Sequence, residues 1–362
     1  MRPETYHAII RGQRPGLGAF AARAGFRLAS WPYGLAMRAR NALYERGWKR
    51  VVRAPVPVVS IGNLTLGGTG KTPCVEYVAA RLRDRGLRPA ILSRGYGAEH
   101  HRNDEAMVLE ENLPDVPHLQ GRDRAALAMT AVEELDANAI VLDDGFQHRR
   151  LARDLDLVLL DATVPLAREA IFPRGTLREP VAGLHRAHAI ILTRCDQAAD
   201  VESQLAWLAK RFPNKPVVRA VHAPLELMGG DGVVESLSGL NGAPVAAFCG
   251  IGNPDAFRDT LARLGTNLVD FRVFPDHHAY TREDVADLAR WADKLPTDAI
   301  VVATQKDWVK LRMDDLGGRR FRALRIGFHV IAGESELDRL FDRVFPEEIV
   351  ENAEDDGDET EN

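Results

Sequence analysis

The chain has 362 residues, of which 45% are apolar and 27% are charged, and its formal net charge is −5. This length allows two domains, and the composition is ordinary for a globular protein. No run of about 18 apolar residues occurs, which excludes a predicted membrane-spanning helix. Three scattered cysteines, Cys74, Cys195 and Cys249, fit buried core positions in a reducing cytoplasm. The first ten residues lack the layout of a signal peptide, so we expect none.

The two ends of the chain carry opposite charge. Residues 1–53 hold 11 Lys and Arg against 2 Asp and Glu, a net +9, whereas residues 347–362 hold 9 acidic and no basic residues, a net −9. The acidic end has no apolar face to bury, and we expect a disordered tail there.

Residues 16–48 are predicted to form one or two amphipathic helices, interrupted at Trp31-Pro32-Tyr33-Gly34. Apolar side chains recur every three or four residues and arginines carry the polar side, as in a helix at a membrane interface. Each Lys or Arg near an anionic leaflet contributes about 1 kcal/mol. A helix packed on a catalytic domain with a solvated arginine face explains the residues equally well. Nucleic acid binding is disfavoured, because no recognised module accompanies the charge.

The segment 56–85 has the order strand, glycine loop and helix. A β-branched run at 58–61 predicts a buried strand, Gly67, Gly68 and Gly70 form the loop, and Lys71-Thr72 open the helix. Such a loop turns backbone N–H groups toward phosphate oxygens, and the helix N-terminus adds positive charge. We expect Lys71 to reach the outer phosphates and Thr72 to hold Mg²⁺. The predicted nucleotide site comprises Thr65, Leu66, Gly67, Gly68, Thr69, Gly70, Lys71 and Thr72, although the usual G-x-x-x-x-G-K-[ST] pattern has glycine where this chain has Thr65.

A second strand is predicted at 89–93, ending in Ser93-Arg94-Gly95-Tyr96. The carboxyl ends of strands in open α/β sheets line the ligand crevice, so we expect Arg94 and Tyr96 beside the phosphates. Residues 100–117 favour a flexible segment or a short helix, followed by a short strand at 117–119 and a helix at 125–135.

The apolar run 139–142 ends in Asp143 and Asp144. An acidic residue at the end of a buried strand orders Mg²⁺ or its water in nucleotide sites. Adjacent residues of a strand point to opposite faces, so one carboxylate should face the metal and the other a different partner. Strands are also predicted at 155–160 and 189–192, and the polar loop 172–180 between them is predicted to reach over the phosphates.

Residues 193–196, Thr-Arg-Cys-Asp, stand where guanine-reading proteins place Asn-Lys-x-Asp, and only the Asp matches. A linker with a small antiparallel ribbon is predicted at about 213–238. A second α/β unit follows, in which a strand at 269–274 ends in Pro275-Asp276-His277-His278.

The motifs of the chain, in their order, closely resemble the tetraacyldisaccharide 4′-kinase family of the lipid A pathway from about residue 57 to residue 311. The motifs are SIGNLTLGGTGKTP, ILSRGYG, RDR, VLDDGFQHRRLARDLDLVLLDA, RGTLREP, FPDHHAY and TQKDWVKL. The resemblance implies ATP-dependent phosphorylation of the 4′-hydroxyl of a tetraacylated glucosamine disaccharide 1-phosphate, giving a lipid IVA-type product. It accounts for Thr65, because family members share a polar residue there.

The same resemblance implies where the protein works and with what. The implied partners are an acylated glucosamine disaccharide lipid and an anionic membrane surface, with no nucleic acid and no obligate protein partner. The implied location is the cytoplasmic face of the bacterial inner membrane, as a peripheral or monotopic protein, which favours the interfacial interpretation of residues 1–53.

The family's functional residues carry over onto matching positions. The catalytic Asp of the family's D-R motif falls on Asp123, and the histidine of its P-D-H motif falls on His277. The resemblance makes Asp123, His277 and Lys71 catalytic. The predicted Mg²⁺ ligands are Thr72 and Asp143, with Asp144 as the alternative carboxylate. It places Arg94, Tyr96, Asp144, Gln147, Arg178 and Glu179 at the substrate or phosphates. The chain departs from the family at Asn103-Asp104-Glu105-Ala106, which replaces G-D-E-P.

These assignments are physically reasonable, because phosphoryl transfer needs alignment and charge neutralisation more than covalent help. Lys71, Mg²⁺ and Arg178 would offset charge on the transferred group. Asp123 would accept the hydroxyl proton, worth about 10²–10⁴ in rate, and His277 would orient or charge it after domain closure.

We therefore expect an α/β fold with a P-loop NTPase-type parallel sheet domain, a second, smaller α/β domain and a basic amphipathic N-terminal helical region. The expected boundaries are 1–53 for the membrane-interfacial helices, 54–212 for the P-loop kinase domain, 213–240 for the linker with its ribbon, 241–346 for the smaller domain that closes over the site, and 347–362 for the acidic tail. Two alternatives are a P-loop GTPase or metallochaperone-type switch, weakened by Thr193 and Arg194, and a non-enzymatic ATP-binding module that recruits to membranes.

Overall fold

A computed structural model describes residues 3–95 and 104–346, which form two compact units. Unit 1 comprises residues 1–94, 116–221 and 329–362, and unit 2 comprises residues 95–115 and 222–328, each within the described ranges. Strands β7 (Val217–Met228) and β13 (Arg319–Ala332) each begin in one unit and end in the other.

Unit 1 is built on a parallel sheet whose strands follow the order β3-β2-β4-β1-β5-β6-β7. Its first six strands in chain order are β1 (Val58–Asn63), β2 (Pro89–Ser93), β3 (His118–Gln120), β4 (Ala139–Asp143), β5 (Leu155–Asp161) and β6 (Ala189–Thr193). Every residue of β1 and β2 is buried, as expected for strands covered on both faces.

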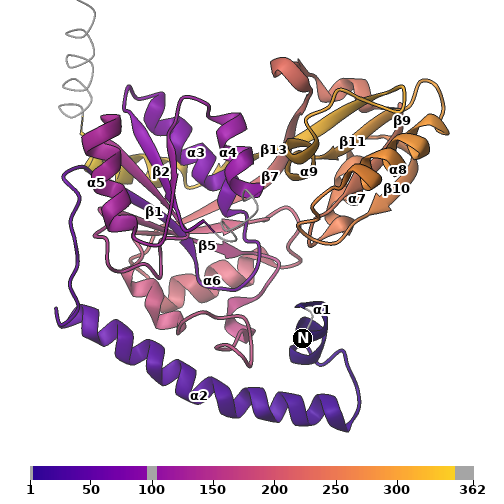
Figure 1. The fold of residues 1–362 in the computed structure, drawn as a ribbon. Helices are drawn as coiled ribbons and strands as arrows, with labels where there is room; N and C mark the ends of the chain where they lie inside the picture. Colours follow the sequence, from indigo (N-terminus) through magenta and orange to yellow (C-terminus); the bar gives the residue numbers. More distant parts are fainter. Residues whose placement is uncertain (1–2, 96–103, 347–362) are drawn as a thin grey trace, which may run out of the picture. The chain divides into compact units, whose positions relative to one another are not determined.

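Helices cover both faces of this sheet (Figure 1). Apolar residues of α5 (Arg124–Leu135) and α6 (Val201–Arg211) pack on one face. On the other face lie α3 (Lys71–Arg83) and α10 (Glu334–Val344), joined by an ion pair between Arg81 and Asp338. The parallel sheet with helices on both faces confirms the predicted fold class.

The N-terminal region forms α1 (Pro3–Ile10) and α2 (Leu17–Glu45). The interruption predicted at Trp31-Pro32-Tyr33-Gly34 is wrong, since α2 is one helix with Pro32 inside it (Figure 1). Proline removes one helical hydrogen bond, but this turn is held from outside. The Tyr33 hydroxyl donates to the carbonyl of Arg178 at 2.8 Å, and Gly34 is buried against Ile171.

Large apolar side chains of α2 remain exposed at helical spacing. The exposed fractions are 88% for Leu17, 65% for Phe20, 74% for Leu28, 77% for Trp31 and 67% for Leu35. Within residues 3–95 and 104–346, no helix combines the length and hydropathy needed to span a bilayer.

Unit 2 has a smaller sheet in the order β10-β9-β11-β13, all parallel. Its strands are β9 (Pro244–Cys249), β10 (Asn267–Val273) and β11 (Ile300–Thr304), with β8 (Val234–Glu235) antiparallel to β7 and β12 (Asp315–Leu316) antiparallel to β13. Its helices are α4 (Asp104–Asn112), α7 (Pro254–Arg263), α8 (Arg282–Asp293) and α9 (Gln305–Leu311). Short 3₁₀ turns occur at Leu166–Arg168, Val181–Arg186, Gly230–Gly232 and Leu237–Leu240.

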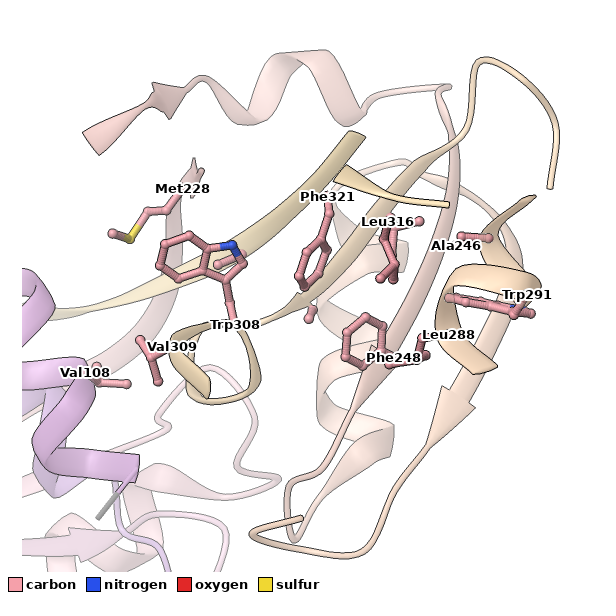
Figure 2. Close-up of a cluster of buried hydrophobic side chains, with 14 residues drawn as sticks. Val108, Met228, Ala246, Phe248, Leu288, Trp291, Trp308, Val309, Leu316 and Phe321 are labelled. Carbon is pink, nitrogen blue, oxygen red and sulfur yellow. The ribbon is translucent and has the colours of Figure 1, made fainter. Parts of the chain in front are cut away.

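The core of unit 2 is aromatic (Figure 2). The rings of Phe248 and Phe321 stack with centroids 5.4 Å apart, and Trp291 meets Phe248 edge-on. Val108 of α4 belongs to the same buried cluster as Val309 of α9, so this core explains why residues 104–115 join unit 2.

The observed division differs from the expected domain boundaries in three places. The expected linker at 213–240 contains the 12-residue strand β7, although the small antiparallel ribbon predicted there is present as the pairing of β7 with β8. Residues 104–115 belong to unit 2, and residues 329–346 belong to unit 1. The return to unit 1 is explained by α10, whose Leu337 and Phe341 are fully buried. The tail predicted at 347–362 lies outside the described residues.

Candidate active site

The glycine loop connects β1 to α3 as its sequence predicts. Gly67 and Gly70 have φ values of 110° and 78°, a conformation that favours glycine. Gly70 precedes the first residue of α3, Lys71, so the loop ends at a helix N-terminus. Gly67 and Gly68 are exposed. The loop therefore presents backbone to solvent at the positive end of a helix dipole, as an anion site requires.

Two buried side chains hold this loop in place. Asn63, at the end of β1, donates from Nδ2 to the Thr69 hydroxyl at 3.1 Å and to the carbonyl of Gly67 at 3.4 Å. Thr193, at the end of β6, donates from its hydroxyl to the carbonyl of Thr69 at 3.0 Å. Thr193 thus braces the phosphate loop from the position where a GTPase would read guanine, which weakens the GTPase interpretation further.

Two cations converge on Asp144. Lys71 Nζ lies 3.5 Å from Oδ1 of Asp144, and Nη1 of Arg178 lies 2.8 and 2.9 Å from its two carboxylate oxygens. Burial alone would raise the pKa of Asp144, but the charges of Lys71 and Arg178 outweigh burial and lower it. Three residues predicted to act at the phosphates are therefore neighbours.

The backbone conformation of Asp144, rather than the alternation of side chains along a strand, sets the direction of its side chain. It follows the last residue of β4, Asp143, in a left-handed conformation with φ 50°. Because Asp144 has left the strand, the predicted rule that adjacent side chains point to opposite faces does not set its direction. The turn packs closely on β1, where a Cβ on Gly62 would lie 2.6 Å from the backbone nitrogen of Phe146.

Buried Glu179 and half-buried Gln147 support this cluster through hydrogen bonds. Gln147 donates from Nε2 to the carbonyl of Asn63 at 2.9 Å and to Glu179 at 3.1 Å. Glu179 is 1% exposed and also accepts from Arg186 at 2.9 Å and from Asn41 of α2 at 2.9 Å. The loop that carries Arg178 and Glu179 is tied to the phosphate loop by a bridge between Thr65 and Leu177.

Thr72 and Asp143 are the predicted magnesium ligands. Thr72 is buried in the first turn of α3, and Asp143 is half-buried at the end of β4. The negative charge of Asp143 adds to burial in raising the pKa of Cys74, one turn into α3. Hydroxyl and carboxylate oxygens are hard donors suited to Mg²⁺, which is usually held by one or two protein groups and substrate phosphates. Within the described ranges, no group of three or more His, Cys, Asp or Glu side chains could hold a metal by itself.

Asp123 lies at the same edge of the sheet, after β3. Its side chain caps α5 by accepting from the backbone nitrogen of Ala126 at 3.2 Å, and it pairs with Arg150 at 2.8 Å. The hydrogen bond from Ala126 and the charge of Arg150 lower the pKa of Asp123. The carboxylate is therefore ionised at neutral pH, as an acceptor of a proton must be. The segment 144–150 thus contacts both Lys71, through Asp144, and Asp123, through Arg150.

His277 lies in unit 2 with φ 57°. Its Nδ1 lies 3.1 Å from Oδ2 of Asp104, and the hydrogen bond to Asp104 raises its pKa. The structure therefore gives Asp123 and His277 partners within their own units, Arg150 and Asp104. Arg94 is exposed directly after β2, while Tyr96 lies outside the described residues.

Several residues of the site escaped the sequence interpretation. Thr193 and Asn41 act through contacts between distant segments, which no local spacing predicts. Arg186 acts through Glu179, which lies seven residues before it. Asn63 is the exception, because a polar residue at the end of a buried apolar strand marks the carboxyl edge of a sheet.

Comparison with known proteins shows which family this chain matches. The family model described as tetraacyldisaccharide-1-P 4′-kinase matches residues 22–345. A tetraacyldisaccharide 4′-kinase from Anaeromyxobacter sp. (strain Fw109-5) is 42% identical over 351 residues, covering 91% of this chain and 94% of the relative. One from Syntrophus aciditrophicus (strain SB) is 39% identical over 299 residues, covering 75% and 80%.

A solved structure is similar over most of its length. The crystal structure of "apo" form LpxK from Aquifex aeolicus in complex with ATP matches with a TM-score of 0.75 and 30% identity, covering 90% of this chain and 99% of that one. The family match and these similarities extend across both units of the described fold. The chain belongs to the tetraacyldisaccharide-1-P 4′-kinase family.

Proposed function

We infer that this protein is an ATP-dependent kinase that phosphorylates the 4′-hydroxyl of a tetraacyldisaccharide 1-phosphate in lipid A biosynthesis, giving a lipid IVA-type product. The observation that carries this function is the convergence of Lys71 and Arg178 on Asp144 beside the glycine loop, in a chain whose family acts on this substrate. A triphosphate in the loop would compete with Asp144 for both cations.

We propose that the phosphate site is formed by residues 65–72, with Arg94, Asp144, Gln147 and Arg178 around it. Lys71 and Arg178 offset the negative charge that the transferred phosphoryl group carries in the transition state. Mg²⁺, held by Thr72 and Asp143, supplies further charge neutralisation when bound. Glu179 positions Gln147 rather than contacting substrate, because its carboxylate is buried and accepts from three protein side chains.

We propose Asp123 as the base that accepts the proton of the sugar hydroxyl, with His277 as a second catalytic residue. Arg150 keeps Asp123 ionised, since the guanidinium lies 2.8 Å from its carboxylate. Tyr96 is proposed at the substrate from the family motif alone.

We also propose that the protein binds the cytoplasmic face of the bacterial inner membrane through α2. The exposed apolar side chains of this helix and the net charge of residues 1–53 support a membrane interface. The contacts from Asn41 to Glu179 and from Tyr33 to the carbonyl of Arg178 connect the same helix to the loop of the phosphate site.

The direct test is transfer of labelled phosphate from γ-labelled ATP to a disaccharide 1-phosphate acceptor in detergent micelles. We expect transfer to the 4′ position by the wild-type protein and a loss of about 10²–10⁴ in rate for Asp123→Ala. A GTP-specific hydrolysis without transfer to the glycolipid would instead support a nucleotide switch.

A further inference from the structure

The segment at the end of β6, Thr193-Arg194-Cys195-Asp196, contains an arginine to which the phosphate site gives no role. Thr193 is fully buried and braces the phosphate loop, whereas the side chain of Arg194 is 30% exposed. Arg194 also adopts a left-handed backbone conformation with φ 56°, which is uncommon for a residue other than glycine. Strained conformations of this kind cluster at ligand sites, so the side chain of Arg194 needs an explanation.

The guanidinium of Arg194 is held by the neighbouring strand. Its Nη1 lies 2.5 Å from Oδ2 of Asp161, the last residue of β5, which pairs with Thr193 in the sheet. The other oxygen of Asp161, Oδ1, accepts from the backbone nitrogen of Thr163 at 2.9 Å and from its hydroxyl at 2.6 Å. Because Asp161 is only 10% exposed and both its oxygens have partners, the pair presents a planar cation to solvent.

The order of the strands indicates where the nucleoside of a bound nucleotide lies. The proposed site for the outer phosphates is at Lys71 and Asp144, on the side of β1 that pairs with β4. On its other side β1 pairs with β5, and β5 pairs with β6. The hydroxyl of Thr193 at the end of β6 donates to the carbonyl of Thr69 in the phosphate loop at 3.0 Å. A nucleotide whose outer phosphates lie toward β4 therefore extends its nucleoside toward the ends of β5 and β6.

We propose that Arg194 binds the purine ring of the nucleotide by stacking its guanidinium on the face of the base, with Asp161 as its positioning residue. This inference rests on the proposed ATP-dependent function and assigns the nucleoside end of the same site. The guanidinium of arginine is planar and delocalised and stacks on aromatic rings, whereas the ammonium of lysine is a compact point charge.

Stacking also explains how this position serves ATP without reading the edge of the base. A carboxylate that recognises guanine must accept from the N–H groups of its ring, but both oxygens of Asp161 already accept from Arg194 and Thr163. A guanidinium donates hydrogen bonds and accepts none. Every base has a π face, so stacking tolerates different bases, and Arg194 should support the binding of ATP and GTP alike.

The experiment is calorimetric titration of the full chain with ATP and with tripolyphosphate, each with excess Mg²⁺ and without a glycolipid acceptor. Tripolyphosphate carries a chain of three phosphates but no nucleoside, so it reports on the phosphate loop alone. Arg194→Ala and Arg194→Lys remove the planar group, and Arg194→Gly removes it with a residue that suits the left-handed backbone. Arg219→Ala is the matched control, because Arg219 lies on the adjacent strand β7, pairs with Glu202 and is 37% exposed.

We expect Arg194→Ala and Arg194→Gly to raise the Kd for ATP about tenfold, because a stacking partner of the base is lost. The Kd for GTP should rise by the same factor. The Kd for tripolyphosphate should stay within about twofold, which also shows that the variants are folded. Arg194→Lys should weaken ATP binding as Arg194→Ala does, and Asp161→Asn should weaken it by a smaller factor. Arg219→Ala should leave every Kd unchanged.

Unchanged ATP affinity in Arg194→Gly would overturn the proposal. Equal losses for ATP and tripolyphosphate would do so too, because Arg194 would then act on the phosphates. Full ATP affinity in Arg194→Lys would show that charge, and not the planar group, is required. The titration contains no acceptor, so an effect of Arg194 on ATP binding without any transfer to the glycolipid would count against the proposed kinase function alone.

Discussion

Arg178 and Asp144 form a hydrogen-bonded ion pair in which one guanidinium nitrogen lies 2.8 and 2.9 Å from the two carboxylate oxygens. The pair joins the loop before the 3₁₀ turn Val181–Arg186 to the turn after β4, and Lys71 shares the same carboxylate. A cation held at this place is ready to exchange its carboxylate partner for a phosphate oxygen.

Arg178→Ala should therefore lower kcat for phosphate transfer by about 10²–10³, the usual cost of removing one preorganised donor from a charged transition state. The rate is measured with saturating ATP and acceptor. Arg174→Ala is the matched control, because Arg174 is exposed on the same loop and should retain wild-type activity. Equal rates for the two variants would exclude a role for Arg178 in charge stabilisation.

Glu179 offers a prediction about stability. Its carboxylate accepts from Arg186 at 2.9 Å while being 1% exposed. Glu179→Ala leaves this guanidinium without its partner, so the free energy of unfolding should fall by about 3–5 kcal/mol. Urea denaturation measures this free energy of unfolding. Glu202→Ala is the control. The carboxylate of Glu202 pairs with Arg219 and its side chain is 81% exposed, so this substitution should change the free energy of unfolding by less than about 1 kcal/mol.

The nucleotide cradle was predictable from sequence because its signals are local. A β-branched strand, three glycines and Lys71-Thr72 follow one another within 15 residues, from 58 to 72, and the structure forms strand, loop and helix in that order. The strand that ends in Asp143 is equally local. Parallel topology then brings both strand ends to one edge of the sheet.

The partners of these residues were not predictable in the same way. The contact of Arg178 with Asp144 spans 34 residues, and that of Asn41 with Glu179 spans 138. Likewise, α4 follows a strand of unit 1 but packs with Val309 in unit 2. Such pairings depend on tertiary packing, which spacing along the chain does not encode.

Histidine burial predicts how stability depends on pH. His118 accepts or donates a hydrogen bond with the hydroxyl of Ser93 at 2.8 Å, and burial lowers its pKa from 6.5 to about 4. The imidazole of His118 binds a proton less readily in the folded state than in the unfolded state. The stabilisation that neutral His118 contributes to the fold is therefore complete above pH 6.5 and is lost as the pH falls toward 4.

Between pH 7 and pH 5 this one group should cost roughly 2 kcal/mol of unfolding free energy. In His118→Gln the loss over the same interval should be smaller by that amount, as measured by urea denaturation at both pH values. His329→Gln, at an exposed position, should keep the wild-type dependence. His148, whose pKa burial also lowers to about 4, adds a parallel contribution that both variants retain.

The exposed apolar side chains of α2 lead to a prediction about membrane binding. Phe20 and Trp31 are 65% and 77% exposed, so replacing them does not disturb a core. Burial of each in a bilayer interface contributes about 2 kcal/mol. Phe20→Ser combined with Trp31→Ser should therefore weaken binding to phosphatidylglycerol-containing vesicles at least about 100-fold in co-sedimentation.

Leu135→Ser is the matched control, since Leu135 is 42% exposed at the end of α5 and should bind vesicles like the wild type. The double variant should fold normally by circular dichroism, because the contacts of Tyr33 and Asn41 with the loop of Arg178 are untouched. Raising the salt concentration should weaken wild-type binding as well, since the arginines of α2 contribute an electrostatic attraction that salt screens. If the double variant binds vesicles as tightly as the wild type, α2 is a helix packed on the catalytic domain with a solvated arginine face, and the membrane contact must lie on another surface.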